Sequence, residues 1–115
     1  AVLFSAQHKL NNLLLVIDYN KMQALGFTKD TLELDPLAAK FEAFGWGCCE
    51  VDGHNLPSII EALEKVPFEK NKPSVIIAHT TKGKGVSFME NSLYWHYTCP
   101  NDEECRLALT SFLRI

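Results

Sequence analysis

Apolar and polar positions divide the chain into short segments that alternate between the spacing of strands and that of helices. Residues 13–17 are apolar without a charge or a polar alternation, which predicts a strand buried on both faces. Residues 46–51 and 74–79 are two further apolar runs with the length of strands. Polar residues begin at Asp18, directly after the first of these runs, so the first strand is expected to end there.

Segments with helical spacing lie between these strands. Residues 1–10 have helical spacing without a capping residue in front of them. A second helix is predicted from Asp35 as the N-cap and Pro36 as the first helical residue, and Gly45 closes it. Asn55 is expected to cap a third helix that extends to Val66. The predicted buried stripes of the second and third helices are Leu37, Phe41 and Phe44, and Ile59, Ile60, Leu63 and Val66.

The alternation of strand and helix predicts an α/β fold, three-layered, with a mostly parallel sheet and flanking helices. Right-handed crossovers place the carboxyl ends of the three strands at one edge of the sheet, where ligands bind in such folds. This edge is expected to gather Asn20, residues 52–55 and residues 79–85.

Two segments are predicted as loops. Residues 20–34 are rich in turn-forming and polar residues. Residues 80–100 contain KGKG and an aromatic cluster, Tyr94 to Tyr97, and a long loop with aromatic residues is usually functional rather than disordered. Ordinary packing or a partner interface explains the aromatic residues equally well. A last helix, capped by Asn101 or Asp102, carries Cys105, Leu109 and Phe112 on its apolar side.

Composition limits the function classes. A chain of 115 residues suits one domain, and 47% hydrophobic with 22% charged residues is typical of a globular protein. A net charge of −3 without a basic cluster argues against nucleic-acid binding. No run is long enough to span a membrane and no signal peptide is visible, so we expect a cytoplasmic location. The adjacent Cys48 and Cys49 are expected to pack as small hydrophobic residues, and a disulfide between Cys99 and Cys105 stays an alternative.

Four blocks occur in an order that resembles the transketolase family: LLLVIDYNKMQALG, FEAFGWGCCEVDGHN, SVIIAHTTKGKGVSFMEN and WH. The chain is most similar to the amino-terminal subunit of split transketolases and more distantly to deoxyxylulose-phosphate synthase. The resemblance implies that residues 1–115 form part of a thiamine diphosphate-binding domain. It implies thiamine diphosphate and Mg²⁺ as cofactors, and the transfer of a two-carbon ketol unit from a ketose to an aldose.

The resemblance also assigns roles to four residues. Asn20 and the backbone carbonyl of Met22 correspond to metal ligands. Lys82 resembles a lysine that faces phosphate in the deoxyxylulose branch, and His96 resembles a histidine near the diphosphate and the sugar. His96 is the candidate catalytic residue. Taken as isolated residues, Asn20 would be an ordinary turn residue and Lys82 part of a solvated loop. His54 is expected to stabilise its turn, and His8 and His79 are interpreted as structural.

The family motif begins with Gly-Asp-Gly, which is absent from this sequence. We therefore expect a truncated chain that depends on a pyrimidine-binding partner subunit or domain, acts on sugar or sugar phosphate substrates and forms an oligomer. Two alternatives stay open. The chain is a non-catalytic remnant that serves as an interaction module, or it belongs to a decarboxylating enzyme like deoxyxylulose-phosphate synthase, an interpretation that Lys82 favours.

Overall fold

Three parallel strands form the central sheet of the computed structural model, which describes residues 1–112. The strands are β1 (Leu14–Tyr19), β4 (Gly47–Asp52) and β5 (Ser74–His79), in the order β1-β5-β4. Tyr19 and Asp52 both pair with His79, so the three carboxyl ends lie at one edge. The predicted parallel sheet is confirmed, and the bounds of β5 are those expected from the apolar run.

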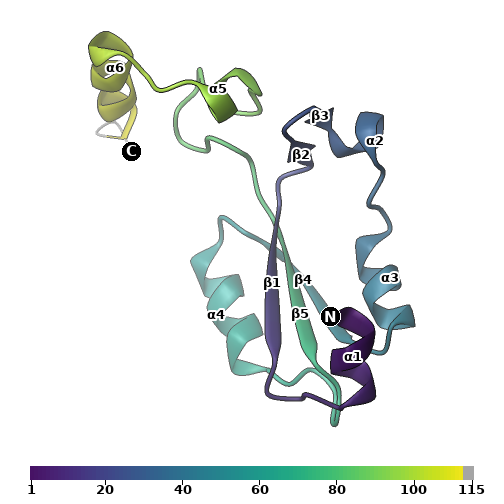
Figure 1. Ribbon diagram of the computed structural model, residues 1–115. Coiled ribbons are helices and arrows are strands. Elements are labelled where there is room, and N and C mark those ends of the chain that lie inside the picture. The colour runs from purple at the N-terminus through teal and green to yellow at the C-terminus, as the bar shows by residue number, and fades with distance from the viewer. Residues whose placement is uncertain (113–115) are drawn as a thin grey trace. The chain divides into compact units, whose positions relative to one another are not determined.

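Helices cover both faces of this sheet (Figure 1). The helices α1 (Val2–Gln7) and α3 (Leu37–Ala43) lie on one face, and α4 (Leu56–Glu64) lies on the other. On the first face, Val2, Ala6, Leu37 and Phe41 pack against a buried cluster that contains Trp46. The remaining members of this buried cluster are Tyr19, Val75 and Ile77. The layered α/β fold expected from the sequence is therefore confirmed.

The prediction that residues 13–17 are buried on both faces is wrong. Val16 is 56% exposed, whereas Val75, Ile76 and Ile77 in β5 are at most 1% exposed. The reason is the strand order, because β1 pairs on one side only within residues 1–112 while β5 pairs on both sides. An unbroken apolar run does not distinguish an edge strand from a central strand.

Helix α3 ends as predicted and begins differently. Gly45 follows the helix with φ +86°, the left-handed conformation that glycine adopts without strain. The N-cap is Pro36 and not Asp35, and no side chain caps the helix. The Lys40 ammonium donates to the backbone carbonyls of Leu34 at 2.9 Å and Asp35 at 3.2 Å, and so holds the segment that precedes the helix. The predicted buried position Phe44 is wrong, since this side chain is 46% exposed.

Asn55 caps α4 as predicted, because its side-chain oxygen accepts a hydrogen bond from Ser58 N at 3.2 Å. The helix ends at Glu64 instead of Val66. Its predicted buried stripe is wrong in part, because Ile60 and Leu63 are exposed and Ala62 is buried instead. A small side chain at the contact lets the helix lie close to the sheet, which no periodicity of large residues indicates.

The chain divides into two compact units. The first comprises residues 1–19 and 33–80, and contains the sheet with α1, α3 and α4. The second comprises residues 20–32 with the chain from residue 81 onward. Apart from residues 33, 34 and 80, both predicted loops belong to this second unit, and both contain regular structure. The first holds β2 (Met22–Gln23), β3 (Gly26–Phe27) and α2 (Thr28–Thr31), and the second holds α5 (Tyr94–Tyr97).

The last helix, α6 (Asp102–Phe112), confirms Asn101 as its capping residue. Asn101 Oδ1 accepts a hydrogen bond from Glu104 N at 2.9 Å, and Glu104 Oε2 accepts one from Asn101 N at 2.8 Å. This reciprocal pair is a capping box. Cys105 and Leu109 are exposed, so their predicted apolar packing is wrong within the described residues. The side chain of Phe112 lies outside the described part.

All four cysteines are free thiols, so the alternative disulfide between Cys99 and Cys105 is absent. Cys48 and Cys49 are half-buried in β4. Burial, and to a smaller extent the nearby carboxylates of Glu42, Glu69 and Glu50, together raise the pKa of the Cys48 thiol to about 11. Cys48 therefore stays protonated at neutral pH and packs as a small hydrophobic residue, as predicted.

Candidate functional site

Asn20 begins the second unit and shapes the hairpin that follows it. Its side-chain oxygen accepts a hydrogen bond from Met22 N at 2.9 Å. In the hairpin, Met22 lies opposite Phe27, and Thr28 N donates to the Lys21 carbonyl at 2.9 Å. In an antiparallel pair, this pattern makes Met22 and Phe27 a pair that exchanges no backbone hydrogen bonds. The N–H and the carbonyl of Met22 therefore both point away from β3.

The outer edge of β2 consequently presents two oxygens. Asn20 Oδ1 lies there because it contacts the outward N–H of Met22, and the carbonyl of Met22 points to the same side of the strand. An amide oxygen has two lone pairs, so Asn20 Oδ1 retains one acceptor position beside its hydrogen bond. Amide and carbonyl oxygens are hard ligands of the kind that Mg²⁺ prefers. Asn20 and Met22, the two residues predicted as metal ligands, therefore both present an oxygen at the outer edge of β2.

The KGKG segment forms a compact loop that is closed by backbone hydrogen bonds. Val86 N donates to the Gly83 carbonyl at 3.1 Å, and Asn91 N donates to the Lys82 carbonyl at 3.0 Å. Glu90 accepts a hydrogen bond from Gly85 N at 3.0 Å and lies 3.9 Å from the Lys84 ammonium. The half-buried Lys82 has no ion-pair partner among residues 1–112. Lys82 is therefore the lysine of this loop whose charge is available to an anion.

Gly83 is required by the shape of this loop. Its φ is +75°, and a Cβ at this position would lie 2.6 Å from the carbonyl oxygen of Met89. The positive φ is a conformation that side chains other than glycine rarely adopt. The close backbone contact adds a second obstacle, because a backbone atom cannot rotate away.

We expect Gly83→Ala to lower the free energy of unfolding by about 2–4 kcal/mol, from strain and the clash together. Urea denaturation measures this loss. Gly45→Ala is the matched control, because Gly45 also has a positive φ while its added Cβ would meet Ala6 at an ordinary 3.4 Å. Equal losses in the two variants would contradict a steric requirement at Gly83.

His96 lies on α5, and its two neighbours fix that helix. Trp95 Nε1 donates to the Phe88 carbonyl at 2.9 Å, which holds α5 on the segment that follows the KGKG loop. The Tyr97 hydroxyl donates to the Ala24 carbonyl at 2.6 Å, which holds α5 on the hairpin. The exposed ring of His96 contacts the Tyr97 ring edge-on at 4.7 Å. The four predicted site residues, Asn20, Met22, Lys82 and His96, therefore belong to one compact unit.

The sequence reasoning missed three residues of this arrangement: Glu90, Asn91 and Tyr97. Tyr97 stood in the aromatic cluster, yet no pattern along the chain pairs it with Ala24. Glu90 and Asn91 follow the KGKG loop closely, and a carboxylate near two lysines was the available signal for Glu90.

The other histidines have the structural contacts expected of them. His54 N donates to Asp52 Oδ1 at 2.9 Å in the turn after β4. His79 Nε2 lies 2.5 Å from Glu50 Oε2, and its ring lies 5.6 Å from that of Tyr19. His8 contacts the ring of Phe4 at 4.2 Å.

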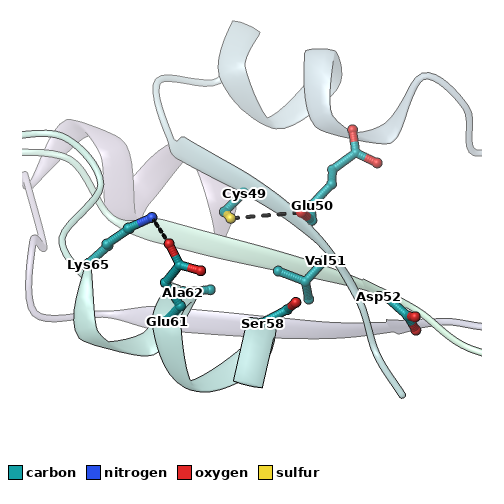
Figure 2. Close-up of a pocket in the computed structure, with 8 residues that line it drawn as sticks. All are labelled: Cys49, Glu50, Val51, Asp52, Ser58, Glu61, Ala62 and Lys65. Carbon is teal, nitrogen blue, oxygen red and sulfur yellow. Dashed lines mark hydrogen bonds and ion pairs between the residues drawn. The ribbon is translucent and has the colours of Figure 1, made fainter. Parts of the chain in front are cut away.

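A pocket of about 280 Å³ lies between β4 and α4 in the first unit (Figure 2). None of the four predicted site residues lines it. Its charged lining includes Glu50, Asp52 and Glu61, and Lys65 is paired with Glu61 at 2.6 Å. This excess of carboxylates repels phosphate groups, so the pocket is not a diphosphate site.

Two absences apply to residues 1–112. No group of three or more His, Cys, Asp or Glu side chains is arranged to hold a metal ion. None of the described helices has the length and apolar character needed to cross a membrane.

Several transketolases of known structure share this fold. The chain aligns with the transketolase of Campylobacter jejuni at a TM-score of 0.86 and 28% identity, over 96% of this chain and 17% of that one. The transketolase of Pichia stipitis in complex with sedoheptulose 7-phosphate has a TM-score of 0.87 at 22% identity, which supports the fold alone. The sheet and its flanking helices are therefore those of a transketolase amino-terminal domain.

Residues 1–112 match the family model of the transketolase thiamine diphosphate-binding domain. The chain is 47% identical over 109 residues to one subunit of the apulose-4-phosphate transketolase of Actinobacillus succinogenes, and 43% identical to one subunit of the 6-deoxy-6-sulfo-D-fructose transketolase of a Clostridium species. These alignments cover 95% of this chain, but only 39% and 40% of the two relatives. The chain belongs to the transketolase family, and the predicted resemblance is confirmed.

Proposed function

We propose that this chain supplies the diphosphate-binding and Mg²⁺-binding part of a transketolase-like transferase, which moves a two-carbon ketol unit from a ketose to an aldose. The observation that carries the proposal is the pair of outward-facing oxygens, Asn20 Oδ1 and the Met22 carbonyl, in a chain of this family. Under this proposal, residues 1–115 form one part of a thiamine diphosphate-binding domain. The relatives are more than twice as long as this chain.

The residues present fit Mg²⁺ as two of its ligands. Mg²⁺ takes six oxygens in octahedral geometry and keeps waters and substrate phosphates among them, with few ligands from the protein. Asn20 and Met22 would provide two oxygens, and diphosphate oxygens, water and a further ligand from outside residues 1–112 would complete the set. Thiamine diphosphate, when bound, supplies the carbon–carbon bond chemistry of the reaction.

Lys82 and His96 would both approach the diphosphate, and His96 would also contact the sugar. The Lys82 ammonium, held in a loop with glycine on its C-terminal side, would pair with a diphosphate oxygen. The ring nitrogens of His96 have no hydrogen-bond partner among residues 1–112. A neutral imidazole can donate to or accept from a sugar hydroxyl near neutral pH and can carry a proton. His96 is therefore the proposed catalytic residue.

Four further proposals concern the whole protein: its partner, its oligomeric state, its substrates and its location. The relatives are named as subunits, which supports a partner that carries the pyrimidine-binding part, and an oligomeric enzyme. The substrates would be sugars or sugar phosphates. The names of the two relatives give two different sugars, so sequence similarity to them does not indicate which sugar this protein would use. A cytoplasmic location stays the expectation from the sequence.

The test is Lys82→Met, with thiamine diphosphate titrated calorimetrically into the full chain together with its partner subunit in the presence of Mg²⁺. We expect an affinity about tenfold lower, the usual effect of losing one charge-assisted hydrogen bond. Lys84→Met is the matched control, because the Glu90 carboxylate lies 3.9 Å from the Lys84 ammonium and disfavours a second anion there, so the affinity of this variant should stay near that of the wild type. Equal effects of the two substitutions would contradict a specific contact at Lys82.

A second candidate function is a decarboxylating synthase of the deoxyxylulose type, which Lys82 favours through its resemblance to that branch. Consumption of pyruvate by the reconstituted complex would support it, and cleavage of a ketose would support ketol transfer. A non-catalytic interaction module is the third candidate, and measurable binding of thiamine diphosphate by the chain would argue against it.

A further inference from the structure

Tyr97 contacts two parts of the second unit with one side chain. Its hydroxyl donates to the backbone carbonyl of Ala24 at 2.6 Å, across 73 positions of the sequence. Its ring meets the ring of His96 edge-on, with the centroids 4.7 Å apart. We call this pair of contacts the Tyr97 bridge. It joins the hairpin that carries Asn20 and Met22 to the helix that carries His96.

Ala24 lies at the tip of the hairpin, where an outside contact has the largest effect on its position. Gln23 pairs with Gly26, so Ala24 and Leu25 form the connection between two strands of two residues each. A hairpin this short is barely stable by itself. The hydrogen bond from Tyr97 therefore does more to fix the hairpin than a single contact would in a long strand.

The other end of the bridge is held as well. Trp95, two residues before Tyr97, donates to the Phe88 carbonyl and contacts the Phe88 ring edge-on at 5.4 Å. The helix α5 is therefore anchored on one side, and Tyr97 extends from it to the hairpin. Trp95 and Tyr97 have different roles in this geometry, because Trp95 fixes the helix and Tyr97 connects it to the hairpin.

From this geometry we infer that Tyr97 is a positioning residue, which sets His96 relative to the oxygens of Asn20 and Met22. The inference rests on the proposed function, which makes those oxygens metal ligands and His96 the residue near the sugar. A catalytic imidazole has to lie within hydrogen-bond distance of the proton that it moves, so a shift of its helix against the metal ligands lowers the rate.

One consequence is that a change in the order of the hairpin alters the position of α5, because Tyr97 contacts both. Mg²⁺ and thiamine diphosphate bound at the outer edge of β2 would order the hairpin, and the Tyr97 hydroxyl would transmit this order to α5. The ring signals of His96 should then change when the cofactor binds, although His96 contributes no ligand to the metal. A diphosphate bound near His96 would change these signals directly in every variant, so the part of the change that the bridge transmits is the part that is lost with the Tyr97 hydroxyl.

The test substitution is Tyr97→Phe in the full chain, which removes the hydroxyl and keeps the ring beside His96. Tyr94→Phe is the matched control, because Tyr94 is on the same helix, is similarly exposed, and its hydroxyl has no hydrogen-bond partner among residues 1–112. The first measurement is amide hydrogen exchange without any ligand. We expect exchange at residues 23–27 to become about fivefold faster in Tyr97→Phe, as for the loss of one hydrogen bond, and to be unchanged in Tyr94→Phe.

The second measurement is the NMR signal of the His96 ring before and after addition of Mg²⁺ and thiamine diphosphate. The change in the wild type should persist in Tyr94→Phe and shrink in Tyr97→Phe. In the reconstituted enzyme, Tyr97→Phe should lower kcat more than it raises KM, because the misplacement affects the reaction more than sugar binding.

The outcomes separate the bridge from the proposed function. Unchanged hydrogen exchange in Tyr97→Phe overturns the bridge, and so does a His96 response equal to that of the wild type. If the wild type binds no thiamine diphosphate with Mg²⁺, the proposed function fails and the positioning role fails with it, while faster exchange still demonstrates the contact between Tyr97 and the hairpin.

Discussion

Replacing Asn20 with alanine is expected to weaken Mg²⁺-dependent binding of thiamine diphosphate by about 100-fold or more, beyond the effect usual for residues that only support metal ligands. The variant loses the amide oxygen proposed as a ligand. It also loses the acceptor for Met22 N, so the second proposed ligand is less well fixed. Calorimetric titration of the chain with its partner subunit, with and without Mg²⁺, measures the effect.

Two control variants make this result specific. Asn20→Asp retains an oxygen that can accept from Met22 N, so it should preserve much of the affinity that Asn20→Ala loses. Asn12→Ala removes the same chemical group at an exposed position before β1 and should leave affinity unchanged. An affinity of Asn20→Ala close to that of the wild type would contradict a metal role for Asn20.

The second large effect is on stability. Trp46→Ala is expected to lower the free energy of unfolding by about 3–5 kcal/mol, the range typical of removing a buried large aromatic side chain. Trp46 is 3% exposed, contacts Phe41 of α3 edge-on at 5.6 Å and donates from Nε1 to the Val2 carbonyl at 3.0 Å. It therefore joins α1 and α3 to the sheet, and its loss should be visible in urea denaturation.

Trp46→Phe separates packing from the hydrogen bond. Phenylalanine keeps most of the apolar contact but leaves the Val2 carbonyl without its donor, so we expect a smaller loss of about 1–3 kcal/mol. Tyr94→Phe provides a reference for an exposed aromatic residue and should stay within about 0.5 kcal/mol of the wild type. A loss below about 1 kcal/mol in Trp46→Ala would contradict the central place of Trp46 in the core.

Much of the fold could be predicted from the sequence because its signals are local. The apolar run of β5 and the caps Asn55 and Asn101 depend on residues close together in the chain. The errors arose where a neighbouring element decides. Val16 is exposed because β1 is at the edge of the sheet, which the apolar run does not encode, and Asp35 lies one residue before the observed N-cap, Pro36.

In the candidate site, too, local motifs could be predicted from the sequence and contacts between distant segments could not. Asn20, Met22, Lys82 and His96 could be named from motifs that resemble a family, since each motif is contiguous. The hairpin was not predicted, because strands of two residues have no period and Ala24-Leu25 is not a typical turn pair. The contact of Tyr97 with Ala24 spans 73 positions, and no pattern in a single sequence indicates such a contact.

The location of the metal is the most direct test of the central claim, that the outer edge of β2 binds Mg²⁺ with the diphosphate. Mn²⁺ favours the same oxygen ligands as Mg²⁺ and broadens the NMR signals of nearby amides. With thiamine diphosphate present, we expect Mn²⁺ to broaden the amide signals of residues 20–24 and 82–85 most strongly. Strongest broadening at the carboxylate-lined pocket of Glu50, Asp52 and Glu61 would contradict the claim.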